Sequence, residues 1–309
     1  MAQRIEVDKM SKVFTLTLNP CFDVTLFVDE VKNNAVSRVK NEVKQAAGKG
    51  INVGKVLCEL GIFPYYCMLL GANSIDEYLQ NVDIDKQQII YAKTKGNVRE
   101  NLTVRAKDET YKINRMSSPC DYSAVQELVN RIVDCGQKDD IVIIAGSLPL
   151  GLSNGDFVKM CKDLKQQGFK IAIDCDFLCR EELVDIKPWM FKVNDDEFHK
   201  LCGSDDFKAH AQSLCSNGIE YVVITMGEKG ILGVNKEQTV SVPSVKVDIK
   251  STVGAGDSAF AGLIAGVETG KSFQDTLKLA SACGGSAVSK DATGLADIVS
   301  VEKLLKTLN

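Results

Sequence analysis

Short apolar runs alternate with amphipathic segments from Ser123 onward, and this alternation restricts the fold more than any other feature of the chain. The apolar runs have the length of strands and cover residues 141–145, 170–174, 189–193 and 221–225. Apolar residues at helical spacing lie between and beside them, at 123–135, 156–167, 195–201 and 207–216. Short apolar strands separated by helices are typical of a parallel sheet that helices cover on both faces. The sequence therefore predicts an α/β fold.

The first part of the chain adds a second kind of segment. Residues 13–18 predict one more strand, and a helical pattern follows Gly50. By contrast, residues 24–46 and 88–116 alternate with polar residues and are too polar to be buried parallel strands. We expect these two insertions to meet in space and form a small antiparallel sheet that projects from the main layer. Since no repeat or Gly-, Pro- or Ser-rich linker interrupts the chain, residues 1–309 are expected to form a single domain.

The composition disfavours several classes of function. Of 309 residues, 37 are Lys or Arg and 41 are Asp or Glu, so the net charge is −4 and nucleic-acid binding is not indicated. No apolar run approaches the ~20 residues of a membrane span. The first twelve residues also lack the apolar core of a signal peptide. We expect a cytoplasmic protein with neither a nucleic-acid nor a membrane partner.

The eleven cysteines form no pattern of metal ligands. The closest pair is Cys175 and Cys179, and nothing nearby completes a tetrahedral set with His199 and Cys202. We interpret the cysteines as reduced, small hydrophobic residues. The chain has only two histidines, so few residues could serve in a His-dependent catalytic triad.

The stretch STVGAGDSAFAG, residues 251–262, places an acidic residue directly behind two glycines. Free backbone N–H groups at a glycine-flanked helix start attract anions. The amides of Gly254, Ala255 and Gly256 are therefore candidates for an anion hole, with Asp257 as a base beside a transferring phosphoryl group. The alternative is that Asp257 caps the helix.

The stretch AAGKGINVGKVL, residues 46–57, nearly fits two phosphate-binding motifs and fails both. Its spacing is wrong for a P-loop, and Val53 stands where a dinucleotide fingerprint needs a small residue. The glycines let a ligand approach the backbone closely, Lys49 supplies a cation, and Asn52 supplies an amide donor and acceptor. The alternative is a plain turn before a helix. The candidates are Gly48, Lys49, Gly50 and Asn52.

Three further strand ends carry polar residues where ligands bind in parallel sheets. Ser147 follows one strand, as a substrate contact or part of a simple turn. Asn194 and Glu197 follow the strand at 189–193 and could organise waters around Mg²⁺, or form a capping box. Thr225, with Gly227 and Gly230, suits a phosphate contact or a hairpin turn.

Taken together and in this order, AGKGINV, AGSLP, KVNDDE, TMGEKG and STVGAGDS resemble the motifs of PfkB/ribokinase-type sugar kinases. The resemblance covers roughly residues 13–305. TLTLNPCFDVT, AAGKGINV and AGSLPLG are most similar to the phosphosugar branch, which holds 1-phosphofructokinases, tagatose-6-phosphate kinases and the minor type of 6-phosphofructokinase.

The resemblance implies a Rossmann-like (ribokinase-like) α/β fold with a β-sheet lid that also forms a homodimer contact. It implies ATP and Mg²⁺ as cofactors, and it allows a monovalent cation to which no residues are assigned. Asp257 is implied as the catalytic base, with Gly254, Ala255 and Gly256 as the anion hole. The implied ATP-site residues are Asn194, Glu197 (which also contacts Mg²⁺ through water), Thr225, Gly227, Gly230 and Gly256. The adenine pocket is expected around residues 281–294.

The same resemblance assigns the sugar side. Asp23, Gly48, Lys49, Gly50 and Asn52 match positions that hold sugar hydroxyls. Arg99 and Asn101 match an R-x-N motif of the phosphosugar branch and, with Lys49 and Ser147, form the expected phosphate clamp. Arg38 is a further candidate that reaches in from the lid; for Arg38 and Arg99 the alternative is a solvated lid surface. The chain departs from the family where Val193 replaces the usual proline of K-P-N.

The expected function is ATP-dependent phosphorylation of a ketohexose phosphate, with fructose 1-phosphate giving fructose 1,6-bisphosphate. Tagatose 6-phosphate, fructose 6-phosphate or an unphosphorylated sugar are alternative substrates for the same chemistry. A non-catalytic sugar-phosphate sensor is the alternative from another class.

Overall fold

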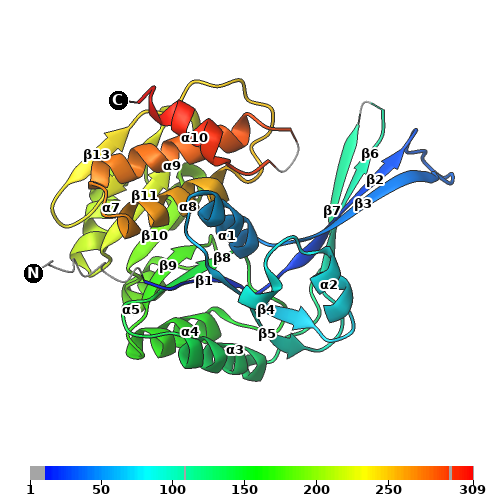
Figure 1. The fold of residues 1–309 in the computed structure, drawn as a ribbon, viewed down its shortest axis with the longest axis horizontal. Helices are drawn as coiled ribbons and strands as arrows, with labels where there is room; N and C mark the ends of the chain where they lie inside the picture. The colour runs from blue at the N-terminus through cyan, green and yellow to red at the C-terminus, as the bar shows by residue number, and fades with distance from the viewer. Residues whose placement is uncertain (1–10, 108, 292–293, 309) are drawn as a thin grey trace, which may run out of the picture.

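A computed structural model describes residues 11–107, 109–291 and 294–308, and its strands form two sheets (Figure 1). Within these residues, the large sheet has nine strands. In spatial order they are β13 (Thr239–Val242), β12 (Ile231–Val234), β11 (Tyr221–Thr225), β10 (Met190–Asn194), β9 (Lys170–Asp174), β8 (Ile141–Ala145), β1 (Val13–Thr17), β4 (Tyr65–Gly71) and β5 (Ile89–Thr94). Neighbours from β11 to β5 pair in parallel, and β12 and β13 continue the edge in antiparallel pairing. The predicted α/β fold with a mostly parallel sheet is confirmed.

Helices cover both faces of this sheet because successive strand residues point to opposite sides. Val142 and Ile144 of β8 belong to one apolar cluster, whereas Ile141 and Ile143 belong to the other. The first cluster is covered by α3 (Tyr122–Cys135), α4 (Asn154–Gln166), α5 (Arg180–Ile186), α6 (Asp195–Cys202) and α7 (Phe207–Ser216). The second is covered by α1 (Lys49–Glu59), α8 (Ala255–Glu268), α9 (Phe273–Val288) and α10 (Ile298–Leu305). A further helix, α2 (Ile75–Asn81), follows β4, and short 3₁₀ turns cover Lys86–Gln88 and Gly227–Lys229.

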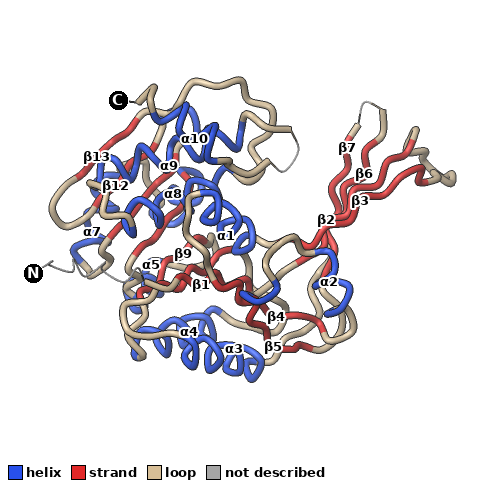
Figure 2. Tube along the Cα trace, viewed as in Figure 1, coloured by secondary structure: helices blue, strands red, loops and turns tan. Residues whose placement is uncertain are grey.

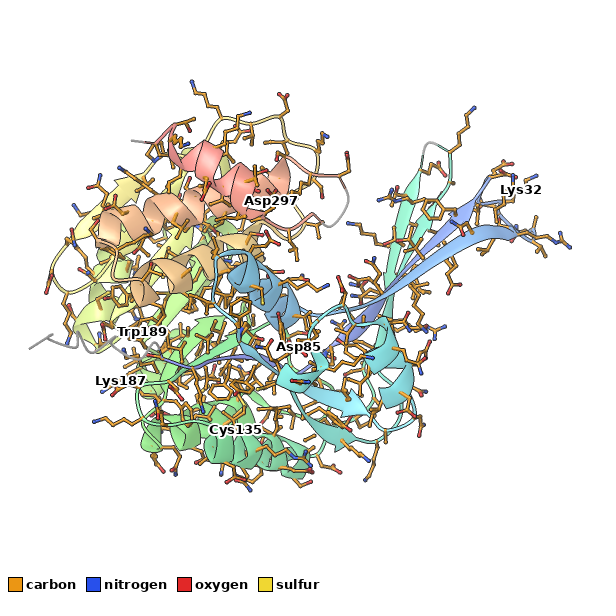
Figure 3. All side chains as sticks on the ribbon, viewed as in Figure 1. Lys32, Asp85, Cys135, Lys187, Trp189 and Asp297 are labelled. Atoms are coloured by element: carbon orange, nitrogen blue, oxygen red, sulfur yellow. The ribbon has the colours of Figure 1, made fainter. Side chains whose placement is uncertain are left out.

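The small sheet projects from the large one (Figure 2). Its order is β3 (Val39–Ala47), β2 (Cys21–Val28), β6 (Arg99–Arg105) and β7 (Thr110–Asn114), so the two insertions do meet in space as predicted. The two hairpins are antiparallel, but β2 and β6 pair in parallel, which the expectation of an antiparallel sheet missed. Lys32, at the far end of the β2–β3 hairpin, is distant from the main body (Figure 3).

One part of the expected insertion 88–116 lies elsewhere. Residues 89–94 form β5, which pairs with β4 at the edge of the large sheet. The prediction that 88–116 as a whole builds the small sheet is therefore wrong for these residues. The physical reason is that an edge strand has a neighbour on one side only and can carry polar residues.

The two faces of the small sheet differ in character. Side chains that share a face with Asp23 and Asn101 are mostly polar, whereas the opposite face, called here the apolar face, carries apolar residues together with the charged Glu42, Lys44 and Glu100. Its large apolar side chains on β2, β6 and β7 include Phe22, Val24, Leu26, Leu102, Val104, Tyr111 and Ile113. At its base, Phe22 packs edge-on against Tyr78 of α2, with ring centroids 5.3 Å apart.

Among the described residues, no helix is long and apolar enough to cross a membrane. In the same part of the chain, no three His, Cys, Asp or Glu side chains are grouped so as to hold a metal ion. Seven of the eleven cysteines are buried and all are free thiols, in keeping with a role as small hydrophobic residues.

Candidate active site

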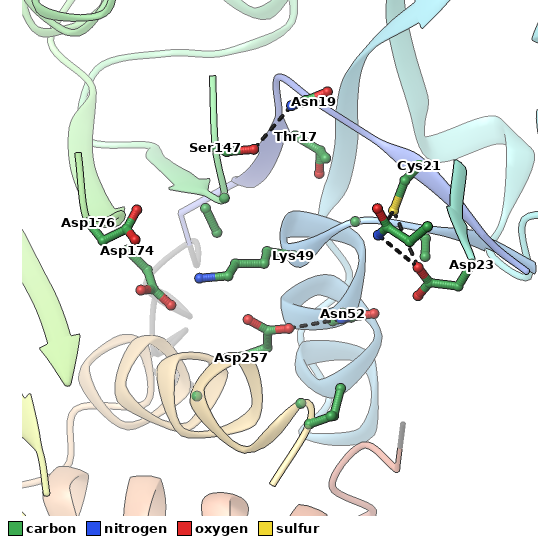
Figure 4. A pocket seen from close by; sticks show the side chains of 18 of the residues that line it. Thr17, Asn19, Cys21, Asp23, Lys49, Asn52, Ser147, Asp174, Asp176 and Asp257 are labelled. Carbon is green, nitrogen blue, oxygen red and sulfur yellow. Dashed lines mark hydrogen bonds between the residues drawn. The ribbon is translucent and has the colours of Figure 1, made fainter. Parts of the chain in front are cut away.

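A cavity of about 580 Å³ opens at the carboxyl ends of β1, β8, β9 and β10, where the small sheet joins the large one (Figure 4). Parallel sheets bind ligands at this edge. Three kinds of element line it: strand ends, the first turns of α1 and α8, and the polar face of the small sheet. Of the residues predicted for the site, it gathers Asp23, Gly48, Lys49, Asn52, Arg99, Asn101, Ser147, Asn194, Glu197, Thr225, Gly254, Gly256 and Asp257.

Asp257 is a buried carboxylate in the first turn of α8, with 7% of its surface exposed. The N-cap of this helix is Gly254, whose φ of 85° favours glycine. The alternative in which Asp257 serves as the N-cap is therefore wrong. Asn52 of α1 donates a hydrogen bond from Nδ2 to Asp257 Oδ2 over 2.8 Å. Burial and the nearby charge of Asp174 raise the pKa of Asp257, while the Asn52 hydrogen bond, Lys49 and Lys192 oppose the shift.

A buried ion pair lies close to Asp257 in the cavity wall. Lys192 Nζ lies 3.0 Å from Asp174 Oδ2, and both side chains are almost fully buried. A Cβ on Gly256 would lie 3.0 Å from the same Nζ, so the backbone at Gly256 sits directly beside this ammonium group. The pKa of Lys49 is raised chiefly by Asp174, and its side chain extends toward that carboxylate (Figure 4).

Sequence reasoning missed Asp174 and Lys192, together with Asp176, Asn19 and Cys21 on the cavity wall. A signal for Asp174 was present, because it is the last residue of β9. The strand-end rule that selected Ser147 and Asn194 selects it equally. Asn19 donates from Nδ2 to Ser147 Oγ over 3.1 Å and so shares the strand-end region with a predicted residue.

Adjacent strands β2 and β6 place three polar side chains side by side. Asp23 is opposite Asn101 in the register, and Asn101 Nδ2 donates to Asp23 Oδ1 over 3.0 Å. Arg99 donates from Nη1 to Asn101 Oδ1 and from Nη2 to the carbonyl oxygen of Asn19. Its Nε is buried and has no hydrogen-bond partner among the described residues. Arg99 lines the cavity and is half-buried, so it is not fully solvated surface.

Burial raises the pKa of the Cys21 thiol to about 12, so this side chain stays protonated at neutral pH. Its sulfur lies 3.1 Å from Asn101 Nδ2 and 3.6 Å from Asp23 Oδ1. Cys21 is thus a neutral neighbour of the Asp23 carboxylate.

Asn194 and Glu197 form the capping box that was the alternative interpretation. The Glu197 backbone N–H donates to Asn194 Oδ1 over 2.8 Å, and the Asn194 N–H donates to Glu197 Oε2 over 3.0 Å. Both residues also line the cavity. The box fixes both side chains at its edge without excluding a second role.

A second cavity, of about 660 Å³, adjoins the first and shares Thr225 and Gly256 with it. Gly227 and Gly230 border it in the turn between antiparallel β11 and β12, so this segment does have the hairpin form of the alternative. Ala255 from α8 also contributes. The expected adenine segment 281–294 supplies Ser281, Gly284, Gly285 and Val288, and its residues 292–293 lie outside the described residues.

Two predicted residues line neither of these cavities. Arg38 lies in the loop between β2 and β3, at the far end of the small sheet (Figure 1). Within this one chain, the expectation that Arg38 reaches the site is therefore not met, because the sheet extends away from the body. Gly50 is buried in the first turn of α1, where a Cβ would collide with Thr17 Oγ1. Its small size allows α1 to start close to β1.

Comparisons with known proteins all match this chain to carbohydrate kinases. A family model described as pfkB family carbohydrate kinase matches residues 15–298. The 1-phosphofructokinase of Haemophilus influenzae is 33% identical over 307 residues, which span 96% of this chain and 97% of that protein. The tagatose-6-phosphate kinase of Staphylococcus epidermidis is 25% identical, over 96% of this chain and 98% of that protein. The crystal structure of phosphofructokinase-2 from Escherichia coli in complex with potassium superposes with a TM-score of 0.87 at 23% identity, over 97% and 99% of the two chains.

Proposed function

This chain belongs to the pfkB family of carbohydrate kinases, and we propose that it transfers the γ-phosphoryl group of ATP to fructose 1-phosphate, forming fructose 1,6-bisphosphate. One juxtaposition carries the proposal. The same cavity holds a buried carboxylate at a helix N-terminus, Asp257, and a half-buried guanidinium group, Arg99. A kinase for a phosphorylated sugar needs a base at one hydroxyl and a cationic clamp for the phosphate already present. The 1-phosphofructokinase of Haemophilus influenzae, 33% identical, supports this choice of acceptor.

In the proposed reaction, Asp257 accepts the proton of the attacking sugar hydroxyl. Its burial favours this role, because a desolvated carboxylate has a greater affinity for a proton than an exposed one. The hydroxyl oxygen attacks the γ-phosphorus in line as the bond to the ADP oxygen breaks. Negative charge on the transferring group is stabilised by the amides of Gly254 and Gly256 and by the ammonium groups of Lys49 and Lys192. Ala255 was expected in this anion hole, but its N–H already donates to the carbonyl oxygen of Thr252 over 3.4 Å.

The nucleotide is proposed to extend from this point into the second cavity, past Thr225, Gly227 and Gly230. Its mostly apolar walls suit a base, and Gly256 and Thr225 border both cavities. Mg²⁺ prefers oxygen ligands and keeps several waters, so one carboxylate such as Glu197 fits a water-mediated contact, held in place by Asn194. When bound, Mg²⁺ neutralises charge on the phosphate oxygens. We assign no residues to a monovalent cation.

The sugar is proposed to lie between Asp257 and the polar face of the small sheet. Asp23, Asn52, Asn101 and the backbone at Gly48 line this space and can bind hydroxyl groups. Arg99, with Ser147 and its partner Asn19, then holds the phosphate of the substrate. Lys49 was expected in this clamp, but its ammonium group faces Asp174 and Asp257 and is better placed for the transferring phosphoryl group.

We further propose that the small sheet acts as a lid on a single kinase domain and forms a homodimer contact. Its apolar face leaves Tyr111 and Ile113 40% and 55% exposed, and the equivalent face of a second copy could cover them. Closure over the sugar would exclude water and limit hydrolysis of ATP.

The first test is ADP production from ATP and Mg²⁺ with fructose 1-phosphate, tagatose 6-phosphate, fructose 6-phosphate and free fructose. We expect a kcat/KM for fructose 1-phosphate that exceeds the others by at least about tenfold, as differential binding of one substrate phosphate allows. A preference for tagatose 6-phosphate or fructose 6-phosphate would keep the chemistry and correct the acceptor. Binding of ATP without turnover of any sugar would contradict the kinase assignment and favour a sugar-phosphate sensor.

A further inference from the structure

We propose that Asn52 is a positioning residue for the base: its amide holds one oxygen of Asp257 so that the other faces the sugar hydroxyl. This inference rests on the proposed function and adds a role to a residue otherwise expected to touch the sugar. The hydrogen bond from Asn52 Nδ2 to Asp257 Oδ2, at 2.8 Å, joins α1 to α8 (Figure 4). The two residues are 205 positions apart in the sequence. In the part of the chain that the structure describes, no hydrogen bond reaches the other oxygen of Asp257, Oδ1.

Both ends of this hydrogen bond are rigidly supported. The start of α1 is pressed onto β1, since a Cβ on Gly48 would lie 2.6 Å from Thr17 Cγ2. Farther along α1, Val53 and Leu57 pack in the same buried cluster as Phe260 of α8. The amide and the carboxylate are therefore held by packed helices, and their geometry does not depend on a bound sugar.

The charges around Asp257 explain why a neutral donor is needed there. Asp174 repels the ionised form of Asp257, whereas Lys49 and Lys192 attract it. Both lysines are shared with Asp174: Lys192 forms the 3.0 Å ion pair, and Asp174 is also the strongest influence on Lys49. The Asn52 amide adds a favourable interaction with ionised Asp257 that Asp174 does not share.

Asp23 offers a matched comparison in the same cavity. Asn101 Nδ2 donates to one oxygen of Asp23 over 3.0 Å, just as Asn52 does to Asp257. In the proposed function Asp23 binds a hydroxyl and transfers no proton. Loss of the two asparagine amides should therefore have different kinetic consequences.

The experiment compares Asn52→Leu with Asn101→Leu in full pH profiles of kcat and of kcat/KM. For Asn52→Leu we expect kcat to fall about 10- to 100-fold, which is a larger change than the rise in the sugar KM caused by loss of the residue's own hydroxyl contact. Loss of the donor removes stabilisation of the carboxylate, so its pKa rises and the acid limb moves to higher pH, by about one unit. For Asn101→Leu we expect a higher sugar KM and an unmoved acid limb. A raised sugar KM with unchanged kcat and acid limb in Asn52→Leu would overturn the proposal.

A second measurement separates this inference from the proposed function. The Tm of Asn52→Leu, Asp257→Ala and the double variant should be non-additive by about 2 °C or more if the two side chains are coupled. Additive shifts would overturn the coupling even if the enzyme is active. If the wild-type protein turns over none of the sugars, the proposed function fails, and the cycle alone decides whether Asn52 holds Asp257.

Discussion

The two sheets of this protein supply opposite walls of one cavity, and they differ in how their polar groups are held. In the large sheet, strands such as β8 are buried on both faces, and the charges of β9 and β10 are buried too: Asp174 and Lys192 are 2% and 4% exposed. In the small sheet, Asp23, Arg99 and Asn101 are only partly buried and contact chiefly one another and the chain around Asn19. The large sheet thus fixes its charges by packing, whereas the small sheet, proposed above as a lid, leaves polar groups half-buried at the cavity.

This difference predicts a division of labour. A catalytic group must be oriented before the substrate arrives, which suits the packed body. Side chains that bind a substrate phosphate can be brought into their final positions by the substrate itself. That suits the half-buried polar groups of the small sheet. Substitutions in the body should therefore act mainly on kcat, and substitutions in the lid mainly on the sugar KM.

The largest expected effect is that of Asp257→Asn. The amide cannot accept the hydroxyl proton, so kcat should fall by about 10³- to 10⁴-fold while the affinity for ATP is retained. Steady-state kinetics and ATP titration would measure both quantities. Asp23→Asn is the matched control from the lid, and there we expect a raised sugar KM with kcat within about tenfold. Turnover of Asp257→Asn within a few-fold of the wild-type protein would show that Asp257 is not the base.

A smaller effect is expected for Arg99→Ala. The clamp would lose its charge-assisted hydrogen bonds to the substrate phosphate, which corresponds to a sugar KM raised about 10- to 100-fold. The KM for ATP should not change, since Arg99 lines the first cavity and not the second. Arg105→Ala is the control, because Arg105 lies on the same strand but is exposed.

Equal changes in the KM values for sugar and ATP would argue against a phosphate clamp at Arg99. An unchanged sugar KM would argue for an acceptor without a phosphate at this position. Either result would break the proposed contrast between body and lid.

The same contrast explains what the sequence could predict. The sequence predicts β8, β9, β10 and β11 because strands that are buried on both faces consist almost entirely of apolar residues. Residues 89–94 were misassigned to the lid, since an edge strand and a lid strand have similar polar patterns. Glycine-rich motifs located the start of α8 and Asp257.

Sequence reasoning could not find the buried charges and their partners. Lys192 lies within an apolar run, where nothing in the pattern distinguishes a buried ammonium group from one that extends to solvent. The bond between Asn52 and Asp257 joins positions 205 residues apart, and it depends on how α1 packs against α8. Such contacts are properties of the tertiary structure, which local patterns do not encode.

The smallest expected effect concerns the proposed dimer and tests the apolar face of the lid. Ile113→Lys places a charge on this face, and we expect the dissociation constant of the dimer to rise about tenfold, since a charge would lose water on association. Sedimentation across a range of protein concentrations would measure it. The Tm of the body should stay within about 2 °C, because Ile113 is 55% exposed and packs against no part of the large sheet's core. Val299→Lys is the control, as Val299 is an exposed apolar residue of α10 on the body. If the wild-type protein is monomeric, or if Ile113→Lys and Val299→Lys dimerise equally well, the apolar face is not the dimer contact.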